Sequence, residues 1–289
     1  MKSAISMDRR GFLAGAVGVT GALALGLGPQ SASAVVRPTF LGGYILLPVM
    51  KEIALELVST AENSTKAWRS SYGYVEDIGD GRGYTAGIVG WCSGTGDMLE
   101  LVKHYTLTTP GNPLQKYLPA LRRIMAAAYS RRPALSHTLL GRAFITAWAS
   151  AAKTAAFQAA QRYERDRVYW NPALAATKRD HLGPLGLYVY YDISVNHGPG
   201  NDSESFGGII AGVKARGHHS PAQGGSEAAY LSAIISARDA VLRSWGDYQS
   251  DGRSSIGRKF LRDKNLKLTL PLRWTIYGDG YSITKPPAP

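Results

Sequence analysis

Hydrophobic residues recur at helical spacing through most of the chain. In residues 51–63, Ile53, Leu57, Val58 and Ala61 fall along one side of a helix, because positions three or four apart share a helix face. Helical spacing or alanine-rich runs predict further helices over 94–104, 113–128, 143–169, 172–191 and 227–245. The pattern therefore predicts a mainly α protein.

One region between these helices has a different pattern. Residues 80–91 contain four glycines among β-branched and aromatic residues. This composition suits short, twisted strands joined by tight turns. We expect a small β-sheet near residue 80, and loops rich in Gly and Pro over 197–208 and 221–225.

The first 34 residues are typical of an export signal that is removed from the mature protein. Arg9 and Arg10 precede an apolar stretch over 14–28, and small residues at 32–34 suit signal cleavage. A membrane anchor is the alternative, but a spanning helix needs about 20 strongly apolar residues, and this stretch is shorter and weaker. We expect a twin-arginine signal over 1–34 and a mature domain over 35–289, soluble and secreted.

Composition narrows the possible partners. The chain has one cysteine, Cys92, so no disulfide can form within it and the core alone must supply stability. A net charge of +12 and a pI near 9.7 are common in nucleic-acid-binding proteins. The basic residues are scattered, however, and no nucleic-acid motif occurs. We predict no nucleic-acid partner and no membrane partner.

Several short motifs point to chemistry that their context does not support. Gly81 and Gly83 fit a loose dinucleotide fingerprint, but they open no helix. Cys92 lies in a run resembling a nucleophile elbow, although a small buried thiol is its commoner role. Residues 76–81 lack the spacing of a calcium loop, and the six histidines show no metal pattern. We expect no metal and no organic cofactor.

A pair of carboxylates, Glu62 and Asp80, suits acid–base chemistry better. Glu62 lies at the end of the predicted helix, where the negative end of the helix dipole favours the protonated carboxyl group. Asp80 lies between two glycines in a turn that we expect to be exposed, so it should stay ionised and can take a proton from water. A two-carboxylate hydrolase requires this division. From spacing alone, a solvated helix end and a turn-forming residue remain the commoner explanation.

Longer runs of sequence add to this pair. Ala-Glu-Asn-Ser surrounds Glu62, Glu-Asp-Ile-Gly-Asp-Gly-Arg-Gly-Tyr-Thr extends from Glu76 to Thr85, and Cys-Ser-Gly-Thr-Gly-Asp-Met-Leu begins at Cys92. Together with 164–169, 197–202, 221–225, 271–274 and 277–279, these runs are distributed along nearly all of the mature chain. They closely resemble the bacterial chitosanases of glycoside hydrolase family 46.

This resemblance implies a fold and a reaction. The expected fold is mainly α (α+β, lysozyme-like), with two lobes separated by a substrate cleft and a small β-sheet in the minor lobe. The expected reaction is endo-hydrolysis of β-1,4 links between glucosamine residues of chitosan, with inversion. Glu62 would be the general acid, Asp80 the general base, and Thr85 would hold the attacking water. Inverting enzymes keep the two carboxyls about 6.5–9.5 Å apart, and we predict that separation here.

The resemblance also assigns residues around the pair. Asp97 matches an acidic residue that pairs with a glucosamine ammonium. The matched cleft-lining residues are Arg82, Thr95, Tyr169 and His197. Asp192, Arg238 and Arg253 match a buried ionic network behind the acid, which would orient Glu62. A scaffold salt bridge is the alternative for these three, and the two roles are compatible.

Two places depart from the family pattern. Residues 125–141, which include Arg131 and Arg132, form a longer and more basic segment than the resemblance leads us to expect. We expect this segment to alter one end of the cleft or the hinge between the lobes. Trp245 stands where some relatives have a more polar residue, which predicts one missing subsite contact.

Two other functions stay open. A lysozyme-like muramidase or chitinase shares the two carboxylates and the fold, but it needs no ammonium partner at Asp97. A non-catalytic protein that binds cell-wall polysaccharides would use the basic surface and the 16 tyrosines. Our expectation is a monomer that acts on chitosan outside the cell.

Overall fold

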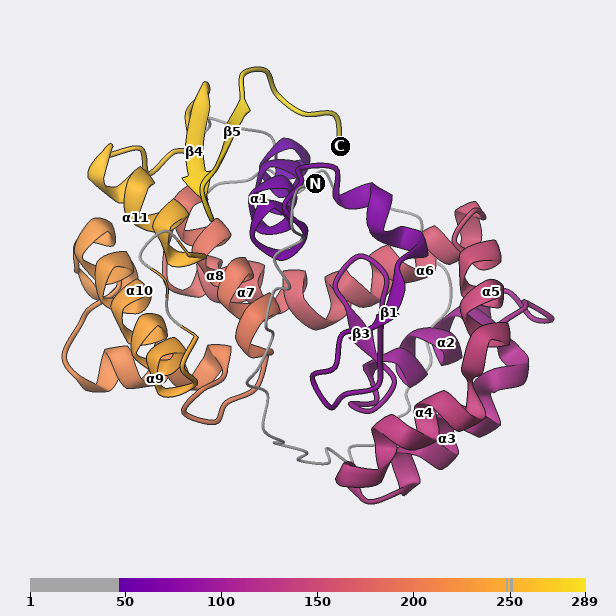
Figure 1. Ribbon diagram of the computed structural model, residues 1–289. Helices are drawn as coiled ribbons and strands as arrows, with labels where there is room; N and C mark the ends of the chain where they lie inside the picture. The colour runs from indigo at the N-terminus through magenta and orange to yellow at the C-terminus, as the bar shows by residue number, and fades with distance from the viewer. Residues whose placement is uncertain (1–46, 248, 250–251) are drawn as a thin grey trace, which may run out of the picture. The chain divides into compact units, whose positions relative to one another are not determined.

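The computed structural model describes residues 47–247, 249 and 252–289, so the signal predicted over 1–34 lies outside the described residues. The chain divides into two compact units (Figure 1). The first contains Ala54–Ala175 and Ser194–Pro199, and the second contains 47–53, Ala176–Ile193 and Gly200–Pro289. No helix among the described residues has the length and apolar character needed to cross a membrane.

Helices dominate both units, as the sequence predicts. The α-helices are α1 (Leu47–Asn63), α2 (Asp97–Thr108), α3 (Leu118–Ala126), α4 (Arg132–Leu139), α5 (Gly141–Ala151), α6 (Ala155–Arg165), α7 (Asn171–Arg179), α8 (Pro184–His197), α9 (Phe206–Ala215), α10 (Glu227–Ser244) and α11 (Ser254–Arg262). Short 3-10 turns occur at η1 (Trp68–Gly73), η2 (Gln115–Tyr117), η3 (Tyr129–Arg131) and η5 (Pro221–Gln223), and η4 (Asp166–Trp170) is π-helical.

The strands form two small antiparallel sheets. The first unit holds β1 (Val75–Asp77), β2 (Tyr84–Ala86) and β3 (Trp91–Cys92), in the order β1-β2-β3. Asp77 pairs with Tyr84, and Thr85 pairs with Cys92. The second unit holds the hairpin β4 (Leu272–Ile276) and β5 (Asp279–Ile283). The predicted sheet near residue 80 is confirmed, with Asp80 in the turn between β1 and β2.

The structure corrects two predicted helices. The helix expected over 143–169 is broken, because the side chain of Thr154 caps a new helix by accepting a hydrogen bond from the Phe157 N–H at 3.2 Å. The helix expected over 172–191 is also two helices. Pro184 begins α8, and a proline disfavours helical backbone at the residue before it. The sequence patterns did not predict α4, α9 or α11.

An aromatic core supports the sheet of the first unit. Tyr105 of α2, Trp148 of α5 and Phe157 of α6 are buried, and the ring centroids of Trp148 and Phe157 are 4.9 Å apart. The indole N–H of Trp148 donates to the Tyr72 carbonyl at 3.0 Å. Burial of such side chains stabilises the fold by about 1.5–3 kcal/mol each. Helix α2 contacts β3, so this core gives the sheet a rigid backing (Figure 1).

A buried polar cluster orders the second unit. The Tyr190 hydroxyl donates to Asp180 Oδ2 at 2.7 Å, and Lys214 Nζ lies 2.5 Å from Asp180 Oδ1. Burial by itself would raise the pKa of Asp180, but hydrogen bonds from Arg179, Lys214 and Tyr190 lower it. This cluster ties α8 and α9 together around an ionised carboxylate.

Candidate active site

The turn between β1 and β2 carries Asp80. The last pair of the two strands, Asp77 and Tyr84, closes this turn. Gly83 has φ of +74°, and a Cβ there would lie 2.5 Å from Ser93 Oγ and 2.6 Å from Ser136 Oγ. Only glycine combines that backbone conformation with so close an approach. The local sequence therefore specifies both the turn and its tight packing.

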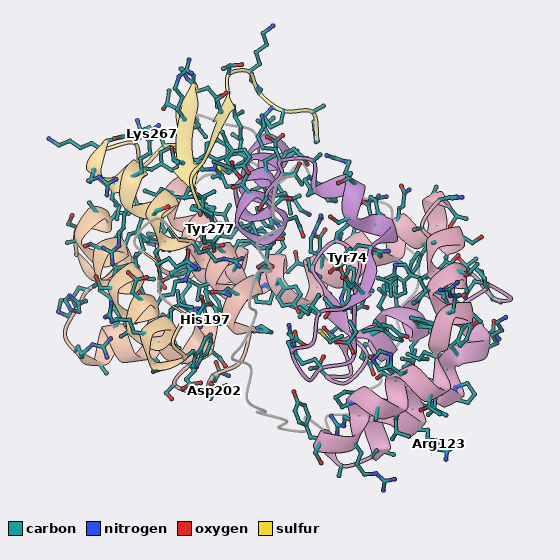
Figure 2. The ribbon with its side chains drawn as sticks, viewed as in Figure 1. Tyr74, Arg123, His197, Asp202, Lys267 and Tyr277 are labelled. Atoms are coloured by element: carbon teal, nitrogen blue, oxygen red, sulfur yellow. The ribbon has the colours of Figure 1, made fainter. Side chains whose placement is uncertain are left out.

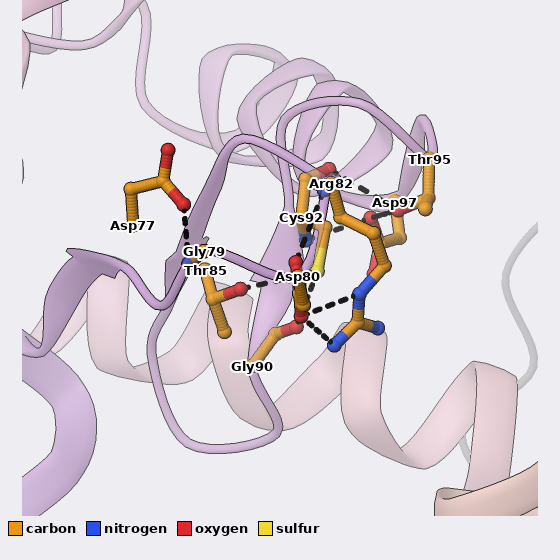
Figure 3. Close-up of polar contacts among 9 residues, drawn as sticks. All are labelled: Asp77, Gly79, Asp80, Arg82, Thr85, Gly90, Cys92, Thr95 and Asp97. Atoms are coloured by element: carbon orange, nitrogen blue, oxygen red, sulfur yellow. Dashed lines mark hydrogen bonds and ion pairs between the residues drawn. The ribbon is translucent and has the colours of Figure 1, made fainter. Parts of the chain in front are cut away.

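Asp80 is held by Arg82, two residues further along the same turn. Nε and Nη2 of Arg82 donate to Asp80 Oδ2 at 2.8 and 2.6 Å, and the backbone N–H of Arg82 donates to Oδ1 at 3.0 Å (Figure 3). The Asp80 side chain is only 3% exposed. Gly79 and Gly81 are exposed, as expected for this turn, but the carboxylate is not, because the side chain folds back against the guanidinium instead of extending into solvent.

Arg82 is itself charged and well held. Burial opposes its charge, but Cys92, Asp80 and Asp97 raise the pKa of the guanidinium. An arginine offers a rigid planar fork, which fixes the direction of a carboxylate better than a lysine ammonium does. Arg82 was predicted to line a substrate cleft. In the structure, its guanidinium donates hydrogen bonds to the Asp80 carboxylate.

Thr85 lies inside the sheet, beside Cys92. Thr85 is 0% exposed, and its Oγ1 lies 3.4 Å from Cys92 Sγ. The thiol donates to the Gly90 carbonyl at 3.3 Å (Figure 3). Because a thiol has one proton, the Thr85 hydroxyl is the donor in its contact with sulfur, which leaves its oxygen free to accept. A water held by Thr85, as predicted, would need an opening to this buried oxygen.

Cys92 has the inert role that the sequence favoured. Its side chain is buried, and burial, followed by the negative charge of Asp97, raises the pKa of the thiol to about 11. A nucleophilic cysteine reacts as the thiolate, so a thiol protonated near neutral pH is a poor nucleophile. The structure therefore supports a small buried thiol at this position.

Asp97 begins α2 and joins it to the sheet. Its Oδ1 accepts hydrogen bonds from the Cys92 N–H, the Thr95 hydroxyl and the Met98 N–H, at 2.9, 2.6 and 3.0 Å (Figure 3). Burial raises the pKa of Asp97 even though these hydrogen bonds lower it. Thr95 is exposed, and Asp97 is half-buried. The structure thus brings Asp80, Arg82, Thr85, Thr95 and Asp97 into one small region of the first unit.

Glu62 lies in the last turn of α1 and is half-buried. It lines a small pocket with Asn63, Tyr74 and the turn Gly87–Gly90 (Figure 2 labels Tyr74). Ile88 and Val89 make part of this lining apolar. Glu62 is therefore next to the β2–β3 turn, whereas Asp80 is in the β1–β2 turn. Strand residues advance about 3.3 Å each, so the three residues of β2 separate the two turns by roughly 10 Å.

The two remaining predicted cleft residues of this unit differ in exposure. Tyr169 lies in the π-helical segment η4 and is half-buried, and its carbonyl accepts from the Ser194 hydroxyl at 3.3 Å. His197, labelled in Figure 2, ends α8 and is 1% exposed, so its side chain offers almost no surface to a ligand. Among the described residues, no hydrogen bond joins Tyr169 or His197 to Asp80 or Asp97.

The predicted ionic network forms in the second unit. Arg238 Nη1 and Arg253 Nε donate to Asp192 Oδ2 and Oδ1, each at 2.7 Å. All three residues are buried, at 2%, 8% and 1% exposed for Arg238, Arg253 and Asp192. One buried carboxylate is thus shared by two guanidiniums. The spacing of these residues along the chain could not have selected them, because they come from α8, α10 and the residue before α11.

Sequence reasoning missed a group on α4 that contacts the sheet. Ser136 is fully buried and accepts a hydrogen bond from the Ser93 hydroxyl at 2.8 Å, and His137 Nε2 lies 2.5 Å from Asp77 Oδ2. Both residues belong to the segment 125–141, which we expected to depart from the family pattern. Only that departure could have drawn attention to them.

Comparison with known proteins gives consistent matches. The sequence model of the family described as Glycosyl hydrolase family 46 matches residues 56–272. The chain is 53% identical over 239 residues to a chitosanase from Streptomyces sp. (strain N174), which covers 82% of this chain and 82% of that protein.

Solved structures agree with the sequence match. A co-crystal structure of chitosanase OU01 with substrate has a TM-score of 0.75 and 46% sequence identity, and the match covers 82% of this chain and 97% of that one. A mutant chitosanase from Bacillus subtilis MY002, complexed with 6 GlcN, has a TM-score of 0.71 and 31% identity, covering 83% and 100%.

Proposed function

Because the chain belongs to glycosyl hydrolase family 46, we propose that it is a chitosanase, which hydrolyses β-1,4 links between glucosamine residues within chitosan chains. The predicted family and the lysozyme-like, mainly α fold are confirmed. Related proteins bound to substrate and to 6 GlcN support chitosan as the ligand. The muramidase or chitinase and the non-catalytic binding protein are not favoured by these relatives.

The different environments of Glu62 and Asp80 support their roles as general acid and general base. Glu62 lies beside the turn at one end of β2, and Asp80 lies in the turn at the other end. Glu62 lines a partly apolar pocket in the last turn of a helix, where the helix dipole favours the protonated carboxyl. Asp80 accepts two hydrogen bonds from the Arg82 guanidinium, which fix the direction of its carboxyl group. Glu62 would protonate the leaving oxygen, and Asp80 would take a proton from the attacking water.

The spacing suits inversion. A retaining enzyme brings its carboxyls to about 5 Å, so that one can attack the sugar, whereas an inverting enzyme leaves room for water. The turn beside Glu62 and the turn that holds Asp80 are roughly 10 Å apart along β2, a span compatible with the wider arrangement. We therefore propose that the carboxyl groups of Glu62 and Asp80 are about 6.5–9.5 Å apart when substrate is bound, as in inverting enzymes.

Asp97 would bind the substrate's positive charge. Chitosan presents ammonium groups, and a carboxylate that accepts a charged N–H forms a strong hydrogen bond. Three hydrogen bonds on Oδ1 hold the side chain still, so it needs little reordering on binding. Thr95 would contribute a polar edge beside it.

Proton NMR of the products of chitosan hydrolysis tests this function. We expect the α-anomer to form first from the β-link, at a rate reduced about 10²-fold or more in Glu62→Gln and Asp80→Asn. Glu100→Gln is the matched control, because Glu100 is an exposed acid of α2 paired with Lys103. Initial release of the β-anomer would reject inversion, and wild-type turnover in either variant would remove that residue from its role.

Export remains a proposal that rests on the sequence. The Arg9–Arg10 pair and the cleavage site at 32–34 support secretion of a monomeric enzyme through the twin-arginine route. Mass spectrometry of the protein from culture medium should give an N-terminus near Val35, and size-exclusion chromatography should give the mass of one chain. An intact N-terminus retained in the cytosol would contradict export.

A further inference from the structure

Helix α4 is fastened to the sheet that carries Asp80. The Tyr84 N–H donates to Ser93 Oγ at 2.9 Å, the Ser93 hydroxyl donates to Ser136 Oγ at 2.8 Å, and the Ser136 hydroxyl donates to the Arg132 carbonyl at 2.9 Å. Nη1 of Arg132 donates to the Gly94 carbonyl at 2.9 Å. These contacts fix the first two turns of α4 against β2 and the segment that follows β3.

The residue after Ser136 meets the turn itself. Nε2 of His137 lies 2.5 Å from Asp77 Oδ2, and its ring packs edge-on to the Tyr84 ring with centroids 5.0 Å apart. Asp77 and Tyr84 are the pair that closes the turn around Asp80. One side chain of α4 therefore contacts both strands at the point where the turn begins and ends.

Two glycines flank Asp80 in the outer half of this turn, which the bonds between Arg82 and Asp80 also hold. Gly79 and Gly81 are exposed and have φ of +74° and +79°, and glycine carries the largest conformational entropy of any residue. The Gly79 N–H donates to Asp77 Oδ1 at 2.8 Å (Figure 3). One oxygen of Asp77 thus holds the residue next to Asp80, while the other oxygen is held by His137. A continuous chain of contacts leads from α4 to the base.

We propose that His137 is a positioning residue for Asp80, acting through Asp77 and the turn. This inference rests on the proposed role of Asp80 as general base. The side chains of His137 and Asp77 are 52% and 22% exposed, and a polar contact so exposed adds little to global stability. Its effect is on the geometry of the turn, where a shift of about 1 Å in a catalytic group can cost up to 10²-fold in rate.

Steady-state kinetics on chitosan tests the role of His137. We expect His137→Ala to lower kcat about ten-fold, with KM changed less than about two-fold, because the base is displaced and the binding residues are not. His137→Gln should recover most of kcat, because its amide nitrogen reaches the position of Nε2 and donates to Asp77. Thr138→Ala, at the exposed next residue of α4, is the matched control and should match wild type.

A double-variant cycle separates positioning from loss of the helix. The Asp77→Ala, His137→Ala double variant should be no slower than Asp77→Ala alone, since both changes break one chain of contacts. Should His137→Ala fail to fold, His137→Asn gives the same information, because its shorter amide does not reach Asp77. Wild-type kcat in a folded variant that cannot reach Asp77, while Asp80→Asn is inactive, would overturn the role of His137 and leave the proposed function standing. Activity in Asp80→Asn would instead overturn the proposed base.

Discussion

The guanidinium of Arg82 binds Asp80 through a single carboxylate oxygen. Nε and Nη2 both donate to Oδ2, at 2.8 and 2.6 Å, while the Arg82 N–H occupies Oδ1 at 3.0 Å. Two residues of one turn thus form a closed unit in which the arginine decides where the carboxylate points. A base held this way has a fixed direction before substrate arrives, which lowers the entropic cost of reaching the transition state.

Replacing the planar guanidinium of Arg82 by the ammonium group of a lysine should slow the reaction. Arg82→Lys keeps the positive charge but loses the two-pronged contact, so we expect kcat to fall about 10–100-fold. Arg122→Lys changes an exposed arginine of α3 and should leave kcat unchanged. Stopped assays of reducing-end release check both variants, and a kcat for Arg82→Lys equal to wild type would show that charge alone suffices.

Asp97 should cost stability at neutral pH while aiding binding. Its pKa is raised in the folded protein by burial, so the folded state binds more protons than the unfolded state and stability falls as pH rises from about 4 through the folded pKa. Asp97→Asn keeps an acceptor at Oδ1 and removes this penalty. We expect the free energy of unfolding of Asp97→Asn, relative to that of wild type, to increase as the pH rises across that window. Urea unfolding at several pH values measures this difference.

The same Asp97→Asn variant should bind chitosan more weakly. Loss of a charge-assisted hydrogen bond costs about 1.5–3 kcal/mol, so KM should rise about ten-fold or more. Glu100→Gln, on the exposed side of the same helix, is the control for a loss of one negative charge. An unchanged KM would show that Asp97 serves only to join α2 to the sheet.

The thiol of Cys92 should be unreactive toward thiol reagents in the native enzyme. Burial raises its pKa to about 11, so at pH 8 nearly all of it is protonated and shielded from reagent. We expect a thiol reagent to label the protein at pH 8 only after urea unfolding, with native activity unchanged by the reagent. Rapid native labelling would show that the β2–β3 turn opens readily.

Asp192 should be essential for stability. Asp192→Ala leaves two buried guanidiniums without their shared carboxylate, which should cost about 3–5 kcal/mol, or roughly 10 °C in Tm. Asp263→Ala removes an exposed ion pair with Lys259 and should cost less than about 1 kcal/mol. Thermal unfolding followed by circular dichroism checks both. A small loss in Asp192→Ala would mean that other anions neutralise the two arginines.

Short-range sequence patterns determined much of this protein. The apolar spacing before Glu62 predicts α1, and the glycines around Asp80 predict a turn between short strands, because helix faces and positive-φ turns depend on neighbours only a few residues away. Family motifs then selected Glu62, Asp80 and Asp97 from many other carboxylates. Helix breaks at Thr154 and Pro184 were missed, since a cap or a proline competes with a strong helical pattern.

Contacts between distant residues were decided only by the tertiary structure. Spacing cannot show that Asp80 folds back on Arg82 and is 3% exposed, or that His137 reaches Asp77 from a helix 60 residues away. Such contacts depend on where whole elements pack, and packing is a sum over many side chains that no local pattern encodes. The sequence by itself determined which residues form the turn and the helix end; the tertiary structure decided how firmly the base is held there, and by what.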